Sequence, residues 1–139
     1  AEITMAMLEG MDALEFLDLQ HSQIASIDSL SLQNLKVLKL SNNVIKFGSL
    51  ANGLLPTKTR IQELVLDFNL IGVLKANSFK GADKLSYLDL SNGGIERIEA
   101  DAFQGLSNLV TLLLHGNSIG DLAANTFRGL GALRVLELQ

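Results

Sequence analysis

The residues of this chain that could catalyse a reaction are a small set of carboxylates. A general acid–base pair needs two carboxyl groups whose environments split their pKa values. The nearest candidates are Asp67 and Asp89, which we expect one strand apart on an open, water-accessible face. Because no pocket is expected there to shift either pKa, two solvated surface acids are favoured over a catalytic pair.

Metal binding is no better supported by the sequence. Calcium takes about six to eight oxygen ligands, and Asp67, Asp89, Ser91 and Asn92 offer too few in a suitable loop. The chain has no cysteine, which excludes a thiolate zinc site. The two histidines, at positions 21 and 115, fall four repeats apart, roughly 19 Å at ordinary strand spacing, so they cannot share one ion. We therefore predict no metal and no cofactor.

Other functional classes are disfavoured by motif and charge. The chain has no G-x-S-x-G, no phosphate-binding loop and no H-E-x-x-H. Its net charge of -4 disfavours a nucleic-acid partner, because phosphate contacts need clustered Lys and Arg. No apolar run approaches the roughly 18 residues that span a membrane. The sequence predicts a protein that is not an enzyme, binds no nucleic acid and makes no membrane contact within this segment.

The elements that would position functional side chains follow from an internal repeat. Leucine accounts for 29 of the 139 residues, and the pattern formed by Leu14, Leu17 and Leu19 recurs in phase along the chain. The first positions of the pattern are Leu14, Leu35, Ile61, Leu85, Leu109 and Leu133. A regular unit of about 24 residues indicates a solenoid of stacked repeats.

Each unit has two halves with different periodicity. The L-x-L core alternates with period two, which predicts a short strand with every other side chain buried. The second half, seen best at 98–106, has room for one irregular or 3₁₀-like turn but not for a full helix. One apolar position in this half is predicted to form a spine on the convex side, made of Phe79, Phe103 and Phe127 with Leu8 and Leu55.

A unit this small cannot bury its apolar face alone, so neighbouring repeats must stack into one continuous core. We predict an α/β solenoid with about six short parallel strands on its concave side and loops or 3₁₀ turns on its convex side. The predicted organisation is one domain over residues 1–139. It divides into a partial repeat at 1–13, repeats that start at 14, 35, 61, 85 and 109, and a partial repeat at 133–139.

These residues resemble the leucine-rich repeat family, whose pattern is LxxLxLxxNxI, across essentially the whole chain. The units with Ala102-Phe103-x-Gly105-Leu106 are similar to the subtype common in animal extracellular proteins such as Toll-like receptors, Slit-type guidance proteins and variable lymphocyte receptors. The resemblance implies a curved, right-handed solenoid at the cell surface or outside the cell. It also implies binding, in innate immunity or cell adhesion, usually through the concave sheet.

The asparagine of the family pattern is present in some repeats and absent from others. In the family its side-chain amide bonds neighbouring backbone groups in a ladder, and Asn43, Asn69 and Asn117 fit that role. Ser22 is a weaker substitute, and Gly93 has no side chain. We predict a local gap in the ladder at Gly93, with room for a water molecule.

Two further departures concern the longest unit and the chain ends. The unit at 35–60 holds Gly48, Asn52-Gly53 and Pro56, which mark a loop that leaves the regular course. An insertion without function is favoured there over a contact site. The cysteine-containing caps that usually close extracellular family members are missing. A piece cut from a longer protein is the favoured explanation, with ends covered by another chain as the alternative.

The residues that flank the buried leucines must point outward, because side chains alternate across a strand. The resulting concave face mixes aromatic and aliphatic groups with acids, which is typical of a protein–protein contact surface. Its aromatic side chains are the expected anchors. The candidate site residues of the concave face are Phe16, Asp18, Lys39, Val65, Asp67, Phe68, Tyr87, Asp89, Leu113, His115 and Glu137.

We therefore expect a non-catalytic recognition module, a segment of a receptor or adhesion ectodomain that binds a protein ligand through its concave face. The acids of that face favour a partner with a basic surface. A solvated sheet without a contact role stays an equal alternative. The runner-up function is a structural solenoid that forms homo-oligomers by stacking its uncapped ends, and a secreted microbial protein for host adhesion is a weaker third.

Overall fold

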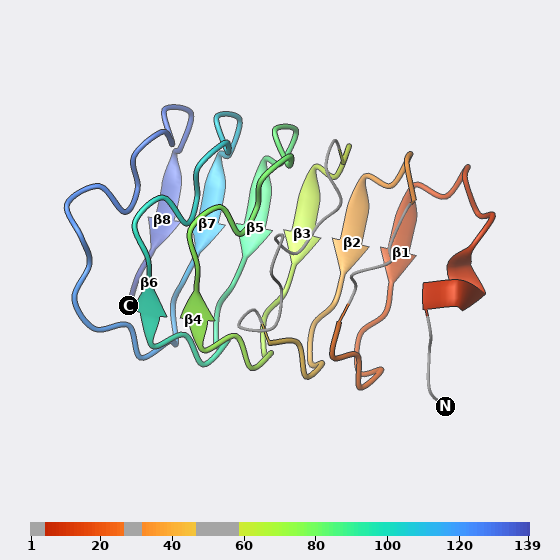
Figure 1. The fold of residues 1–139 in the computed structure, drawn as a ribbon, viewed down its shortest axis with the longest axis horizontal. Helices are drawn as coiled ribbons and strands as arrows, with labels where there is room; N and C mark the ends of the chain where they lie inside the picture. The colour runs from red at the N-terminus through yellow and green to blue at the C-terminus, as the bar shows by residue number, and fades with distance from the viewer. Residues whose placement is uncertain (1–4, 27–31, 47–58) are drawn as a thin grey trace.

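The chain winds into a solenoid with one parallel sheet along its length (Figure 1). A computed structural model describes residues 5–26, 32–46 and 59–139. The sheet has six strands in the order β1-β2-β3-β5-β7-β8. Their bounds are β1 (Phe16–Asp18), β2 (Val37–Lys39), β3 (Glu63–Val65), β5 (Tyr87–Asp89), β7 (Thr111–Leu113) and β8 (Val135–Glu137). The predicted fold class is confirmed.

The register of the sheet follows the leucine pattern. The central leucine of each strand pairs with the central leucine of the next, as Leu38 does with Leu64 and Leu88 does with Leu112. These four side chains are fully buried, while the residues on either side of each are only half-buried. A slip by one residue would turn the leucines toward water, so their burial sets the pairing.

The convex side contains a short two-stranded sheet that we did not predict from the sequence. Beyond the expected turns, β4 (Val73–Leu74) and β6 (Arg97–Ile98) pair in parallel as a second, two-stranded sheet. The two strands occupy equivalent positions in consecutive repeats of regular length. They therefore lie side by side and form backbone hydrogen bonds (Figure 1). The single 3₁₀ helix among the described residues is η1 (Met5–Leu8), and none of their helices is long and apolar enough to cross a bilayer.

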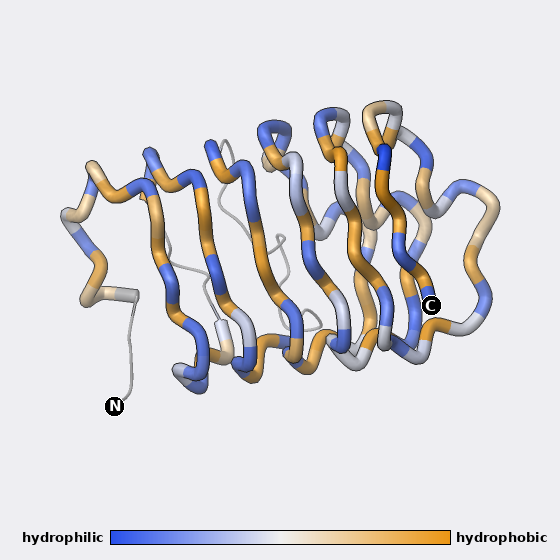
Figure 2. The backbone as a smooth tube through the Cα atoms, turned by 180° about the vertical axis from the view of Figure 1, so that it is seen from behind, coloured by the Kyte–Doolittle hydropathy of each residue, from blue (hydrophilic) through white to orange (hydrophobic). Residues whose placement is uncertain are grey.

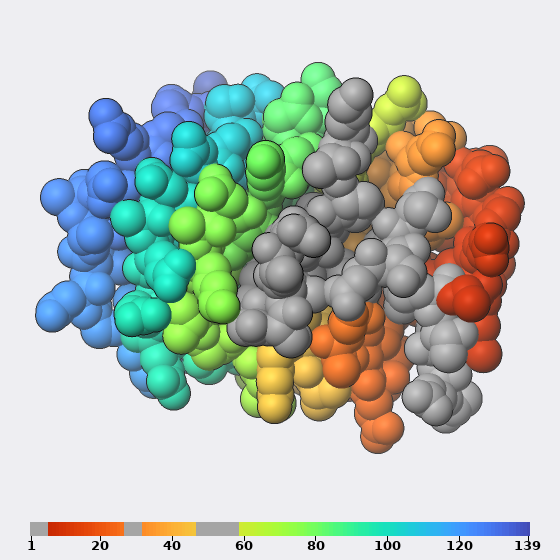
Figure 3. Space-filling view, in the orientation of Figure 1, coloured from red at the N-terminus to blue at the C-terminus, as the bar shows by residue number. Residues whose placement is uncertain are grey.

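The core runs between the two sides as one apolar column. Figure 3 shows successive repeats packed as adjoining bands from red to blue, and Figure 2 shows hydrophobic residues alternating with hydrophilic ones along the strands. On the convex side the rings of Phe79 and Phe103 stack with centroids 6.2 Å apart, and Phe127 continues the stack at 6.0 Å. The predicted phenylalanine spine is confirmed, and Leu8 packs half-buried against the core. Leu55 and the loop predicted around Pro56 lie outside the described residues.

The asparagine ladder forms where its residues are present. The side-chain amide of Asn43 donates to the carbonyl oxygens of Leu19 and Leu40 at 3.0 and 2.9 Å. Its oxygen accepts from the backbone N–H groups of Ser22 and Ile24. Asn69 and Asn117 make equivalent bonds in their repeats. Each asparagine therefore ties the turn after one strand to the turn of the preceding repeat.

The predicted gap at Gly93 is closed by backbone. The side-chain ladder does break there, but the N–H of Ile71 donates to the carbonyl oxygen of Gly93 at 2.8 Å. A main-chain oxygen thus takes the place of the missing asparagine oxygen, so this donor needs no water. The expectation of a water-filled gap is corrected in this respect.

Candidate functional site

The outward columns of the six-stranded sheet contain the residues predicted for the concave face. Paired outward residues of adjacent strands form two rows across the sheet. One row begins with Phe16, Val37 and Glu63, and the other begins with Asp18, Lys39 and Val65. The rows continue through Tyr87 and Asp89 to Val135 and Glu137, as the pairing of β3, β5, β7 and β8 shows. The sheet therefore brings the candidate residues of the strands together on one face, while Asp67, Phe68 and His115 lie in the turns that follow the strands.

The N-terminal part of the face is an aromatic–cation pair. The side chain of Phe16 is 52% exposed, and the ammonium group of Lys39 lies 5.5 Å from the centre of its ring. A cation at this distance from an aromatic ring is attracted to it. Next to this pair, the carboxylate of Asp18 accepts from the backbone N–H and the side-chain amide of Gln20 at 3.1 and 2.7 Å.

The middle of the face is a tyrosine among carboxylates. Burial raises the pKa of Tyr87 above its ordinary value, and the negative charges of Asp89, Glu63, Asp67 and Glu137 raise it further. The four acids come from strands β3, β5 and β8 and from the turn after β3. A phenolate at this position would face four negative charges, so the hydroxyl group stays protonated and can donate a hydrogen bond to a partner.

The two aspartates considered for catalysis each hold a serine. The carboxylate of Asp67 accepts a hydrogen bond from the hydroxyl of Ser41 in the neighbouring repeat. Asp89 accepts from both the hydroxyl and the backbone N–H of Ser91, at 2.6 and 2.9 Å. These bonds fix the turns that follow the strands, which gives both acids a positioning role at the rim of the face.

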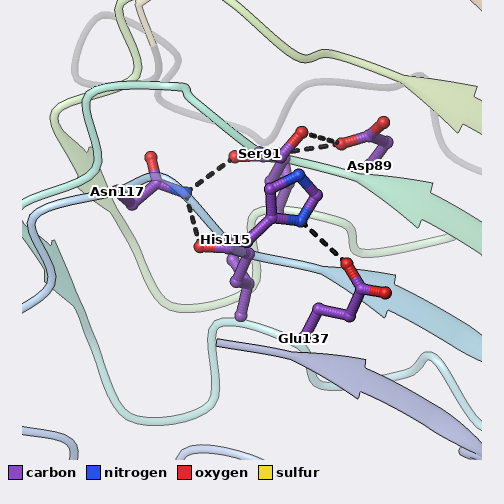
Figure 4. Close-up of polar contacts among 7 residues, drawn as sticks. Asp89, Ser91, His115, Asn117 and Glu137 are labelled. Atoms are coloured by element: carbon purple, nitrogen blue, oxygen red, sulfur yellow. Dashed lines mark hydrogen bonds and ion pairs between the residues drawn. The ribbon is translucent and has the colours of Figure 1, made fainter. Parts of the chain in front are cut away.

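A histidine and a glutamate pair near the C-terminal end of the face, and a serine belongs to the neighbouring repeat. Figure 4 shows the imidazole of His115 between Ser91 and Glu137, with Nδ1 of the ring 3.0 Å from a carboxylate oxygen of Glu137. These are the residue types of a nucleophile, its base and an orienting acid. Together they raise the question of a catalytic triad, which the sequence analysis did not consider.

The hydrogen bonds of Ser91 do not fit that chemistry. A nucleophilic serine donates its hydroxyl proton to the base, but Ser91 donates to Asp89 and is only 3% exposed. Its backbone N–H, the usual donor to an oxyanion, is also bonded to Asp89. Within the described ranges no group of three or more His, Cys, Asp or Glu is placed to hold a metal ion. Ser91 and Asp89 thus stabilise the turn after β5, while His115 and Glu137 stay half-exposed and available for contact.

Sequence reasoning missed two exposed apolar residues beside the face. Val44 and Leu70 are 39% and 53% exposed, next to Phe68 at 51%. They occupy the x of the N-x-I pattern, so the alternation that turns the flanking asparagine and isoleucine inward would have placed them outward. Glu63 was also left out of the predicted site, although it flanks the buried Leu64 and its charge acts on Tyr87.

The repeats of this chain match known protein families. A leucine-rich repeat family model matches residues 59–119 and 83–139, and a model of two leucine-rich repeat copies matches residues 12–52. The chain belongs to the leucine-rich repeat family. No curated protein sequence matches this leucine-rich repeat chain significantly.

Solved structures narrow the type of leucine-rich repeat. The crystal structure of a TLR13–ssRNA13 complex superposes with a TM-score of 0.83 and 30% identity over 94% of this chain and 19% of the TLR13 chain. The Drosophila Toll–Spätzle complex superposes with a TM-score of 0.80 and 18% identity over 99% of this chain and 18% of that chain, which shows the shared fold. The chain is thus similar in fold to segments of Toll-like ectodomains and spans about a fifth of the length of these neighbours.

Proposed function

We propose that this leucine-rich repeat segment recognises a protein ligand through its concave face and catalyses no reaction. The carrying observation is the centre of the face, where the half-buried hydroxyl of Tyr87 lies among four carboxylates. Aromatic side chains with a polar tip are the usual anchors of protein interfaces. The surrounding negative charge suits a partner whose contact surface is basic.

The charge of the concave face also argues for a protein ligand over a nucleic acid. The neighbour TLR13 is seen in complex with single-stranded RNA, and the neighbour Toll in complex with the protein Spätzle. In the two outward rows of the six strands, all within the described residues, Lys39 is the only Lys or Arg, and its ammonium lies 5.5 Å from the centre of the Phe16 ring. Phosphate groups would therefore meet carboxylates, so we assign a protein partner and no nucleic acid.

We further propose that the parent protein is a receptor or adhesion protein with this segment outside the cell. The support is the likeness to the Toll-like structures together with the AFxGL type of repeat. Innate immunity and cell adhesion are the roles that this placement favours.

The proposed function is tested by binding to a panel of purified secreted and ectodomain proteins on a sensor surface. A double variant, Glu63→Lys with Tyr87→Ala, removes the anchor and reverses one acid. Neither side chain makes a hydrogen bond within the described part of the chain, so the turns should stay intact. We expect a ligand of the parent chain to bind at least about tenfold more weakly to this variant.

A matched control places the same kinds of change on the convex side. Glu96→Lys with Leu122→Ala reverses one exposed acid and truncates one exposed apolar residue away from the sheet. Circular dichroism and thermal melting should show that both variants remain folded. If the convex variant loses binding while the concave variant keeps it, the concave face is not the recognition surface.

Self-association stays as the second candidate, because the last strand exposes apolar side chains. Val135, Leu136 and Leu138 are 42%, 38% and 45% exposed. Light scattering after size-exclusion chromatography over a concentration series distinguishes the two functions. Stacking predicts a mass that rises with concentration and falls to the 15.0 kDa monomer in Val135→Lys. A monomer at all concentrations would contradict stacking. At the N-terminal end, Ile3 is the position for the same kind of test, but it lies outside the described residues.

A further inference from the structure

Three exposed apolar residues of two adjacent repeats lie in the turns where the strands end, and we name this set the apolar ledge. It consists of Val44, Phe68 and Leu70, whose side chains are 39%, 51% and 53% exposed. The ledge adjoins the concave face, because Phe68 directly follows Asp67, an acid of that face. Figure 2 shows hydrophobic segments along this lower edge of the solenoid.

The register of the sheet places Val44 and Leu70 next to each other, and Phe68 lies two residues before Leu70 along the chain. Because Leu38 pairs with Leu64, Val44 and Leu70 are equivalent positions in adjacent repeats, about 4.8 Å apart at ordinary strand spacing. The N–H of Leu70 confirms this closeness by donating to the carbonyl oxygen of Ile45 at 3.1 Å. The next two repeats have Gly94 and Ser118 at the same position, so the ledge is confined to the repeats of β2 and β3.

The backbone of Phe68 supplies an independent sign of function. Its φ is +55°, in the left-handed region. The equivalent positions hold His21, Asn42, Asn92 and Gly116, residue types that tolerate this region better than a bulky aromatic residue. With half of its side chain exposed, Phe68 gains less from burial than a core phenylalanine would. A left-handed backbone at a half-exposed aromatic residue is one of the features that gather at ligand-contact sites.

The charges beside the ledge indicate the chemistry of its occupant. A chain that crosses from the concave face to the ledge passes Glu63, Asp67 and Asp89, and the nearest base of the face, Lys39, lies against Phe16. We infer that the ledge docks an apolar side chain of a protein segment whose neighbouring residues are basic. This inference rests on the proposed function, since it extends the concave face around the edge of the sheet.

Synthetic peptides without tyrosine or tryptophan test the inference, because Tyr87 is the only tyrosine of a chain that lacks tryptophan. The basic–apolar probe is acetyl-Gly-Arg-Leu-Phe-Arg-Gly-amide. In the basic control, serines replace its leucine and phenylalanine; in the acidic control, glutamates replace its two arginines. Tyrosine emission reports contact at the concave face, and ¹³C-methyl NMR signals of Val44 and Leu70 report contact at the ledge. We expect the basic–apolar peptide to change both, the basic control to change only the tyrosine emission, and the acidic control to change neither.

The variant Phe68→Asn separates a contact role from a structural one. Asparagine suits the left-handed backbone, so we expect the melting temperature to rise by about 3 °C while the basic–apolar peptide binds at least about fivefold more weakly. A lower melting temperature, or unchanged peptide affinity, would show that Phe68 serves the fold and would overturn the ledge. Changes in tyrosine emission without methyl shifts would overturn the ledge and leave the concave face standing. If all three peptides leave both signals unchanged at millimolar concentration, the ledge and the basic partner are both rejected.

Discussion

The backbone N–H of Ile71 bonds to the carbonyl oxygen of Gly93 at 2.8 Å, where the neighbouring repeats use an asparagine side chain. This substitution requires the peptide between Gly93 and Gly94 to face the opposite way from its equivalents. In the repeats with asparagine, the next residue donates its N–H to the isoleucine carbonyl of the preceding repeat, as Leu70 does to Ile45. Gly94 instead has a φ of +63°, which presents the carbonyl of Gly93 to Ile71.

The first prediction concerns this reversed peptide. Gly94→Ala should lower the free energy of unfolding by about 1 kcal/mol, because alanine disfavours a positive φ. Gly93→Asn should raise the free energy by about 1 kcal/mol, since the restored side chain can bond Ile71 and the nearby carbonyl groups. The new Cβ would lie 3.0 Å from the terminal methyl group of Ile71 and 3.1 Å from the backbone carbonyl oxygen of Leu90, so the gain requires the backbone at position 93 to shift toward the course of the asparagine repeats.

The double variant is the decisive measurement. With Asn at position 93 the peptide can return to the ordinary orientation, so the additional Gly94→Ala change should cost almost nothing. Urea denaturation of the four proteins in this cycle should give a coupling of about 1 kcal/mol. A Gly93→Asn variant less stable than the parent chain, or additive effects of the two changes, would contradict the exchange of a side-chain acceptor for a backbone one.

The second prediction concerns the intact part of the asparagine ladder. Asn69 is 3% exposed, donates to the carbonyl oxygens of Leu40 and Leu66, and accepts from the N–H of Ile45. Asn69→Ala leaves these buried groups without a partner, so unfolding should become easier by about 2–4 kcal/mol. The control is Asn108→Ala, which removes one exposed bond to the carbonyl oxygen of Asp83 and should cost about 0.5 kcal/mol in the same denaturation assay. Equal losses in both variants would refute a special role for the ladder.

Much of the fold was predictable because it depends on spacing alone. A strand with a leucine at its centre can bury that side chain in one register only, so Leu64 pairs with Leu38 on one side and Leu88 on the other. The phenylalanine stack follows from the same period. The convex pairing of Val73 with Arg97 was missed, because neither segment alternates long enough to indicate a strand before the repeats are stacked.

The candidate site was predictable as a face but not as a set of contacts. Alternation identified which residues point outward, whereas the pairing of His115 with Glu137 depends on side-chain rotamers that no sequence pattern specifies. The left-handed backbone at Phe68 was also hidden, because an aromatic residue is not expected there. Asp67 and Asp89 have residue types that fit catalysis, but the structure shows that each carboxylate accepts a hydrogen bond from a serine hydroxyl.

The third prediction concerns the convex spine. Phe103 is fully buried between the stacked rings of Phe79 and Phe127, so Phe103→Ala should cost about 3–5 kcal/mol through the cavity and the lost ring contacts. Phe127→Ala removes a half-buried ring with one stacking partner among the described residues and should cost less. Thermal melting of the two variants compares them directly. A larger loss at Phe127 would mean that the stack is not what the core depends on.

The fourth prediction concerns the titration of Tyr87. Because it is the only tyrosine, absorbance of the phenolate near 295 nm reports its ionisation alone. Burial and the charges of Asp89, Glu63, Asp67 and Glu137 raise its pKa above 10.0. Glu63→Gln removes one of those charges, and the Glu63 side chain makes no hydrogen bond within the described residues. The variant should therefore shift the titration of Tyr87 to lower pH. A titration in Glu63→Gln identical to that of the parent chain would contradict the charge contribution.

The same raised pKa makes a statement about stability. Between pH 10 and the folded-state pKa, the unfolded chain has released the phenolic proton while the folded chain still holds it, so the folded chain binds more protons. Stability is therefore unaffected by this group below about pH 10 and falls as the pH rises through that window. Tyr87→Phe should remove this part of the alkaline loss. Urea denaturation of both proteins from pH 9 to 12 checks the difference, and a basic ligand bound at the face should bring the Tyr87 titration back toward its ordinary pH by neutralising the carboxylates around it.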